Sequence, residues 1–561
     1  MVSLLSNPFR RALILIWAFF IIKSTFYCFL FPLWEGFDEF AHYGFVQYIA
    51  VQRGLPEPDA RLSRDVEESL ALSPLPWTLR DWLPPHVTHD GYWQLAPTER
   101  DFRGNQLRNI PNSLRQQSGV GYLYEGKQPP LYYWILSMVF GSLSSLRLID
   151  AVFILRLVSI MIASIVVPVT FVTAEYVFHN KTRALQVTAL VAALPGLYID
   201  IARVGNDSLA IPLFSLFVYA CVRTTDEPRH ISWAAFFLAL GLLTKAYFVT
   251  AIPVFVLLFI WTAYSQPRRA FTLPAIFSIA LLGGIPGWWY YRVLQNPQSG
   301  FWIDTAASQS TGILNTFRQI PSVDWRNALH SISGSHIWVG GWSFLQVRTW
   351  MYQVFEGMLF LAVLGSLLAL FGYSADLLTK IRRAHLVLLG GIYGCFLAGM
   401  GYHVLVNSLN AHISTSPGWY LYAAILPEAL LISIGLLLLT PTRWRAIVLP
   451  VSTGCFALLE LYTVHFQLIP YYTGFIAHGP SGAVHSFYLS QLRDGGLATM
   501  FARLCTNKPE YLSMAGMACL WLSFVLATVG IIAVTSWAAN ESKRDPSGVQ
   551  LERLFALEPG K

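Results

Sequence analysis

The run of mostly apolar residues Ala12–Leu33 (ALILIWAFFIIKSTFYCFLFPL) passes directly into an acidic and aromatic segment, Trp34–Tyr43 (WEGFDEFAHY). The apolar run is long enough to cross a bilayer core of about 30 Å. Arg10 and Arg11 precede it, and it lacks the small-residue cleavage site of a signal peptide. We therefore expect a retained first transmembrane helix with a cytosolic N-terminus, followed by an element outside the membrane.

The rest of the chain is also poor in charge. Of its 561 residues, 55% are apolar and 12% are charged, whereas a typical soluble domain has about 25% charged residues. This composition excludes a disordered protein, a coiled coil and an ordinary soluble enzyme. The net charge of +7 is spread over short loops between apolar runs, a distribution that orients membrane proteins and gives no sign of nucleic-acid binding. The sequence predicts an all-α polytopic membrane protein.

Two ambiguous segments decide the number of spans. As one helix, 231–264 would measure about 51 Å, so we expect two short spans separated at Thr244-Lys245. Residues 129–146 begin with two prolines, are short for a span and suit a juxtamembrane helix. About 12 transmembrane helices result, with both termini in the cytosol. The other predicted spans are 12–33, 150–178, 184–201, 208–222, 271–291, 352–372, 385–406, 419–439, 446–465 and 514–537.

Loop charges favour this arrangement over its alternative. If 129–146 crossed the membrane and 231–264 crossed it once, Lys181/Arg183 and Arg223/Arg229 would lie outside, against the positive-inside rule. The predicted organisation is then 1–33 (N-terminus and first transmembrane helix), 34–149 (extracytoplasmic loop with juxtamembrane helices), 150–291 (transmembrane core), 292–351 (extracytoplasmic loop), 352–537 (C-terminal transmembrane helices with outer loop 466–513) and 538–561 (cytosolic tail).

The first outer element concentrates the scarce charge. Residues 34–128 hold 22 of the 69 charged side chains, including 13 of the 31 acidic ones. Two further outer loops, 292–351 and 466–513, are long, and long loops in a compact protein are usually functional. We therefore expect the chemistry on the extracytoplasmic face.

The adjacent carboxylates Asp38 and Glu39 are the first candidates. Acidic residues at a bilayer boundary are costly unless they are solvated, paired or used. On a helix the two side chains point about 100° apart, so one could act as a general base while the other orients a neighbour. The alternative is that both are surface charges at the mouth of the outer element.

Two more polar segments fall on the same predicted face. Arg203–Ser208 (RVGNDS) forms a very short loop between apolar runs, where Asp207-Ser208 could also be an ordinary helix N-cap. In Tyr124–Trp134 (YEGKQPPLYYW), Lys127 stands beside a rigid Pro-Pro pair. This lysine could bind a phosphate at the membrane surface or simply extend towards lipid headgroups.

These segments resemble motifs of the GT-C membrane glycosyltransferases, which include protein O-mannosyltransferases, aminoarabinose transferases and uncharacterised bacterial relatives. Trp34–His42 is similar to their Asp-Glu first-loop motif, and Lys127–Trp134 to their Pro-Pro-Leu-Tyr-Tyr-Trp segment. Arg203–Ser208 resembles their second-loop acidic position, and Gly241–Lys245 their Gly-Leu-x-x-Thr-Lys stretch. Trp419 stands where the bacterial branch usually has an arginine, which is a departure from the pattern.

The resemblance implies a specific reaction. A sugar would pass with inversion from a polyprenyl-phosphate donor to an extracytoplasmic acceptor, which could be a lipid, a glycan or a protein. Asp38 would be the general base and Glu39 its helper. The remaining site residues would bind substrate or phosphate: Lys127, Arg203, Asn206, Asp207, His42 and Lys245. The protein would be a multi-pass protein of the cell inner (plasma) membrane, in contact with membrane lipids, with its active site on the extracytoplasmic face.

Other readings remain open from the sequence. A polytopic transporter or lipid-linked-sugar flippase could use Lys245, Glu428 and Glu460 as intramembrane charges, although the two acids could also be paired locally. A non-catalytic envelope assembly protein would have the same composition. No metal-ligating motif is evident, and the pair His86 and His89 is more typical of a solvated loop. The sequence identifies no cofactor and leaves a divalent cation open.

Overall fold

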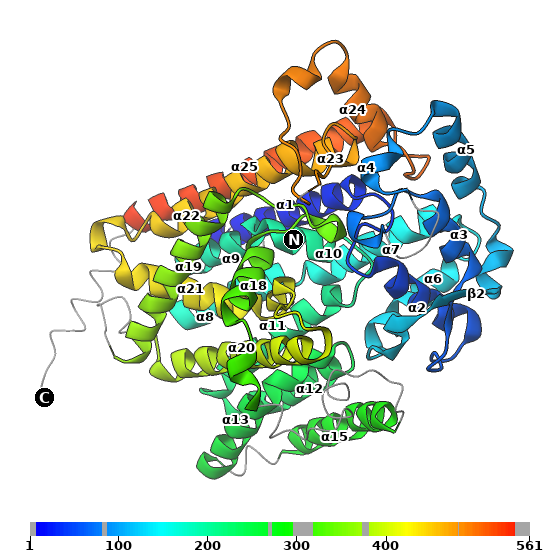
Figure 1. Ribbon diagram of the computed structural model, residues 1–561. Coiled ribbons are helices and arrows are strands. Elements are labelled where there is room, and N and C mark those ends of the chain that lie inside the picture. Colours follow the sequence, from blue (N-terminus) through cyan, green and yellow to red (C-terminus); the bar gives the residue numbers. More distant parts are fainter. Residues whose placement is uncertain are drawn as a thin grey trace, which may run out of the picture.

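The computed structural model describes residues 7–80, 87–266, 272–295, 318–372, 381–480 and 482–544. Long helices form most of the molecule, and an N-terminal group of shorter elements gathers at one end of them (right in Figure 1). Parts of all six predicted regions lie outside the described residues, namely 1–6, 81–86, 267–271, 296–317, 373–380, 481 and 545–561.

The helical, membrane-spanning character is confirmed. The described residues contain nine helices that are long and apolar enough to cross a membrane, or ten if the bent pair α9 (Lys181–Ala193) and α10 (Pro195–Ile201) is one span, so the predicted count of 12 is not confirmed. The nine are α1 (Pro8–Leu30), α7–α8 (Leu148–Ala163 and Val166–Phe178), α11 (Asp207–Thr224), η6–α13 (Ala246–Ala251 and Ile252–Ser265), α19 (Thr349–Leu370), α20 (Arg383–Ala411), η10–α21 (Gly418–Ala424 and Ile425–Leu439), α22–η12–α23 (Val448–Thr463, Val464–Leu468 and Ile469–Tyr472) and α25 (Met514–Arg544).

The first ambiguous segment breaks at the predicted place, but only its second half, η6–α13, is among the candidate spans, whereas α12 (Ile231–Leu242) has 12 residues. Helix α12 ends before Lys245, and η6 begins immediately after it. The turn is tight, because a Cβ on Gly241 would lie 2.0 Å from the Phe248 ring. Helix α6 (Leu131–Ser142) has 12 residues, so it measures about 18 Å and is too short to cross a bilayer. Helix α15 (Leu273–Leu294) packs against α12.

The N-terminal group contains more structure than a loop. It includes a two-stranded antiparallel sheet that the sequence analysis did not anticipate, because its strands are short and far apart in the chain. Gln47 of α2 donates to both oxygens of Asp65, at 3.1 and 2.9 Å, and so joins α2 to α3. The elements are α2 (Glu39–Gln52), β1 (Arg61–Ser63), α3 (Arg64–Leu72), η2 (Trp77–Leu79), α4 (His89–Tyr92), α5 (Pro97–Arg108), η3 (Asn112–Gln116), β2 (Ser118–Tyr122) and η4 (Tyr124–Lys127).

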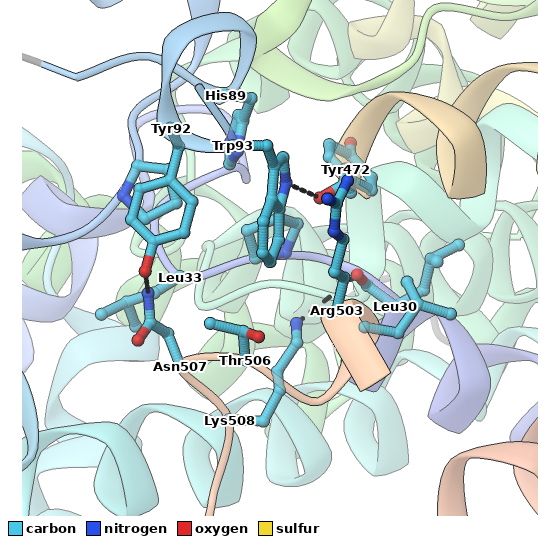
Figure 2. A pocket seen from close by; sticks show the side chains of 13 residues that line it. Leu30, Leu33, His89, Tyr92, Trp93, Tyr472, Arg503, Thr506, Asn507 and Lys508 are labelled. Carbon is cyan, nitrogen blue, oxygen red and sulfur yellow. Dashed lines mark hydrogen bonds between the residues drawn. The ribbon is translucent and has the colours of Figure 1, made fainter. Parts of the chain in front are cut away.

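The C-terminal outer loop covers the end of α1. Figure 2 shows the pocket at this junction, where Trp93 Nε1 donates to the carbonyl of Tyr472 at 2.8 Å. After α24 (Gly496–Leu504), the buried Lys508 donates to the carbonyls of Leu30 and Phe31. Burial, together with the charge of Arg156, lowers the pKa of Lys508 well below its ordinary value. The loop thus supplies an amine donor to the free carbonyls at the carboxyl end of α1.

The acids inside the spans are paired locally. Glu460 of α22 lies 2.7 Å from Lys23 of α1, and both side chains are fully buried. Glu428 of α21 lies 2.7 Å from His336 of α18 (Trp325–Ile337). Local pairing, the alternative left open from the sequence, is therefore what the structure shows for both acids.

The predicted topology can be tested by thiol accessibility. We expect a cysteine replacing Val120, which is 81% exposed in β2, to react with a membrane-impermeant thiol reagent added to intact cells. A cysteine replacing Thr442, in the exposed turn after α21, should react only after permeabilisation. Both variants would be made with Cys519, the exposed native cysteine, replaced by alanine. The opposite labelling pattern would show that the chain has the reverse orientation in the membrane.

Candidate active site

Asp38 lies at the point where α2 begins and has a left-handed backbone, with φ of 54°. Aspartate tolerates this conformation better than most side chains, at some cost in strain. Tyr124 of η4 donates to Asp38 Oδ1 at 2.6 Å. Among the described residues nothing donates to Oδ2, and the side chain is only partly buried. Asp38 therefore has one anchored oxygen and one oxygen that can accept a proton.

The backbone before Asp38 is fixed from two sides. Arg203 donates from Nη1 to the carbonyl of Phe37 at 2.8 Å, and a Cβ on Gly36 would lie 2.6 Å from the Arg203 side chain. The indole of Trp419 stacks on the Phe37 ring with centroids 4.0 Å apart and planes within 4°. Trp419, the residue that departs from the family pattern, thus has a packing role beside Asp38.

Arg203 and Lys245 are both neutralised by carboxylates. Lys245 Nζ lies 2.6 and 2.5 Å from the two oxygens of Asp207, and Arg203 Nη2 lies 2.8 Å from Asp207 Oδ2. The same Nη2 lies 2.7 Å from Asp200, and Tyr247 donates to Asp207 at 3.1 Å. The structure therefore brings Arg203, Asp207 and Lys245 together, next to Phe37 and Asp38.

Glu39 has a different environment from Asp38. Arg156 of α7 donates to its two oxygens from Nε and Nη2, at 2.6 and 2.5 Å, and the backbone N–H of Val204 adds a bond of 3.0 Å. Both side chains of this pair are fully buried. Arg156 also donates to the carbonyls of Cys28, Phe31 and Pro32. Glu39 thus joins α1, α2, α7 and the Arg203 loop, and its oxygens are already occupied.

A second carboxylic acid, Glu125, belongs to the site although the sequence analysis did not select it. Burial, and then the negative charge of Asp38, raise the pKa of Glu125 to about 8. Burial also raises the pKa of Asp38, although Tyr124 and Arg203 oppose this. Glu125 stands two residues before Lys127, but nothing in the spacing distinguished it from an exposed acid of the same element.

His42, Asn206 and Lys127 complete the predicted set. His42 Nδ1 lies 2.8 Å from the Tyr133 hydroxyl and 3.5 Å from Glu125, and burial lowers its pKa well below the ordinary value, so it is neutral. Asn206 is buried and donates to the Thr244 carbonyl at 3.2 Å. Lys127 lies over the Tyr122 ring, with Nζ 5.1 Å from its centroid, and has no carboxylate partner in the described part of the chain.

Glu35 is a further residue that the sequence analysis did not single out. Its buried carboxylate accepts from the backbone N–H and hydroxyl of Ser343, at 2.9 and 3.0 Å, and lies 3.0 Å from His89. Gly341 has a φ of +66°, and a Cβ there would lie 2.6 Å from Glu35. Glu35 therefore ties the segment before Asp38 to η8 (Gly341–Ser343), more than 300 residues away.

The described residues offer no group of three or more histidine, cysteine, aspartate or glutamate side chains that could hold a metal ion. His89 is engaged by Glu35, and Asp90 is engaged by His478. His86, the other histidine of that segment, lies outside the described residues.

Comparison with known proteins gives a distant structural similarity. No family model and no curated protein matches the chain. Among solved structures, it is similar to ArnT from Cupriavidus metallidurans bound to undecaprenyl phosphate, with 13% identity, a TM-score of 0.38 and coverage of 92% of this chain and 79% of that chain. The apo state of the same ArnT gives 11% identity, a TM-score of 0.36 and coverage of 88% and 75%.

The two adjacent carboxylates should differ in their effect on stability. Replacing Glu39 with glutamine leaves the buried Arg156 charge uncompensated, and breaking such a pair costs about 3–5 kcal/mol. Asp38→Asn removes a partly desolvated charge with one hydrogen bond and should leave stability unchanged or higher. The measurement is the thermal unfolding midpoint in detergent, and equal midpoints for the two variants would contradict this assignment.

Stability should also fall as the pH rises from about 4.5 to about 8, because of Glu125. Its folded-state pKa of about 8 exceeds the ordinary value of 4.5, so the folded protein holds a proton that the unfolded chain releases. The contribution is complete below pH 4.5 and is lost as the pH rises through about 8, with a slope of at most about 1.4 kcal/mol per pH unit. Glu125→Gln should flatten this part of the midpoint-versus-pH curve. An unchanged slope would mean that Glu125 is ionised in the folded state.

Proposed function

We propose that the protein is an integral membrane glycosyltransferase that transfers a sugar from a polyprenyl-phosphate donor to an extracytoplasmic acceptor. The observation that carries the proposal is the carboxylate of Asp38, anchored through one oxygen, open at the other, and set beside basic residues at the end of the first span. The motif resemblance of the same residues supports it.

Asp38 is the general base of this reaction. It takes the proton of the acceptor hydroxyl through Oδ2 while that oxygen attacks the anomeric carbon of the sugar. The bond from the anomeric carbon to the phosphate oxygen breaks, and the lipid phosphate leaves with the electron pair. A single displacement of this kind inverts the anomeric centre. The raised pKa of Asp38 suits it to accept a proton.

The cations have two roles in this proposal. Lys127, which has no carboxylate partner among the described residues, binds the donor phosphate and stabilises the charge that develops on it. Arg203 and Lys245 are held by Asp200 and Asp207, so they position the Asp38 backbone and offset the negative charge of the site. Glu39 supports the base through the structure rather than by contact with substrate.

Glu125 and His42 line the other side of Asp38 in this scheme. Glu125 is protonated at neutral pH, so it can donate a hydrogen bond to a sugar hydroxyl instead of repelling the donor phosphate. His42 is neutral and bonded to Tyr133, so it orients Glu125 without adding charge. No step is assigned to a metal ion, and a divalent cation would have to be tested by chelation.

The test is a transfer assay on the purified protein with polyprenyl-phosphate sugars and membrane acceptors. Asp38→Asn should lower the rate by about 10²–10⁴-fold while the protein stays folded, because a positioned base contributes about that much. The matched control is Asp101→Asn, which changes an exposed acid of α5 and should retain the wild-type rate. Full activity of the Asp38 variant would refute its role. Net movement of a lipid-linked sugar across the vesicle membrane, without transfer of the sugar to an acceptor, would favour a flippase.

A further inference from the structure

A long groove runs between α19 and α20 over the surface of α21, away from the ionic site. Its volume is about 370 Å³, which is within the usual range of small-ligand sites. Its walls are α18 at the outer end, the stretch Leu359–Leu370 of α19, the stretch Leu386–Leu397 of α20, and Glu428–Ile432 of α21. The α19 stretch alone extends over about 17 Å. Asp38, Lys127, Arg203, Asp207 and Lys245 do not line it.

Helix α19 packs closely against α21, but α20 does not pack closely against the groove side of α19. A Cβ on Gly365 of α19 would lie 2.2 Å from the carbonyl oxygen of Gly435, so α19 and α21 are in backbone contact. Small residues permit such approach between membrane helices. Gly390 and Gly394 of α20, by contrast, have no atom within 4 Å of a Cβ position, and both line the groove. Helix α20 is therefore not closely packed against α19 along the groove (Figure 1).

The groove opens towards the lipid phase. Val363 of α19 is 54% exposed and Leu397 of α20 is 43% exposed, and both helices are candidate spans. The lining is almost entirely apolar and, within the described residues, contains no lysine or arginine. A ligand that is carried in the membrane reaches such a groove sideways, whereas a water-soluble one does not.

The outer end of the groove is polar and chemically specific. His336 Nε2 lies 2.7 Å from Glu428 Oε1, and with that nitrogen donating, Nδ1 is an acceptor. Nδ1 of His336 and Oε2 of Glu428 are buried and have no hydrogen-bond partner among the described residues. Two buried acceptors without a donor are costly, and a ligand that donates a hydrogen bond would relieve this cost.

We propose that this groove binds a long-chain membrane lipid whose head group is a hydroxyl, with the chain between α19 and α20 and the hydroxyl at His336 and Glu428. A phosphate head fits poorly, because it would place negative charge beside the Glu428 carboxylate, and the described lining contains no lysine or arginine. The site is separate from the phosphate-binding role of Lys127, so the inference goes beyond the proposed function.

The segment η10 connects this groove to the ionic site. Leu421 lines the groove, and the Tyr422 hydroxyl donates to the His336 carbonyl at 2.5 Å. The preceding residue, Tyr420, has its ring centroid 5.1 Å from Lys245 Nζ. A lipid head at His336 therefore lies one short segment away from the cations beside Asp38.

The experiment is photolabelling of the full-length protein in nanodiscs with a diazirine-bearing hexadecanol, without any sugar donor. We expect adducts on peptides of α19, α20 and α21. Gly394→Leu places a side chain in the groove and should reduce labelling by about tenfold. The matched control is Gly454→Leu on α22, whose Cβ position is also open but does not line the groove, and it should label like the wild type.

The head group is tested with the phosphate ester of the same probe and with Glu428→Gln. We expect the ester to label at least tenfold less than the alcohol in the wild type. Glu428→Gln should narrow this difference, because the carboxylate that repels phosphate is removed. Equal labelling of the wild type and Gly394→Leu would show only general contact with lipid, and it would refute the groove as a lipid-binding site. Equal labelling by the two probes in the wild type would overturn the hydroxyl assignment. Because no transfer is measured, neither result depends on the proposed function.

Discussion

The buried ion pair between Arg156 and Glu39 is the interaction on which the active-site end of the structure depends. It lies where the first span ends and α2 begins, and Arg156 also satisfies three carbonyls at the end of α1. Two charges removed from water need good geometry and further hydrogen bonds to be tolerated. Here the bidentate contact and the Val204 N–H supply them. The pair joins the end of α1 to the start of α2, directly after Asp38, whose backbone is left-handed.

The same constraint organises the other charges of the interior. Asp207 is shared by Arg203 and Lys245, Glu460 pairs with Lys23, and Glu428 pairs with His336. Asp38 and Glu125 differ from these acids, because neither has a lysine or arginine in direct contact among the described residues. Burial raises the pKa values of both. Acids with perturbed pKa values of this kind are typical of functional sites.

Much of the architecture followed from local pattern. Apolar length predicted the helical, membrane-spanning class, and the Lys245 break and the short α6 followed from helix rise and bilayer thickness. The small sheet and the helix α18 inside a predicted loop were not anticipated, because neither has a strong period of its own. The buried ion pair of Glu39 with Arg156 was not predicted. Adjacent acids look equivalent in a sequence, and their partners are more than 80 residues away.

What the sequence by itself determined was the class of protein, the helical segments and the motifs that meet near Asp38, since these depend on composition and short-range spacing. Only the tertiary structure decided which charges are paired. It separated Glu39 from Asp38, added Glu125 and Glu35 to the site, gave Trp419 a stacking role, and opened the groove between α19 and α20. The physical reason is that the energy of a charge in a low-dielectric interior depends on its partners within a few ångströms, and those partners come from distant parts of the chain.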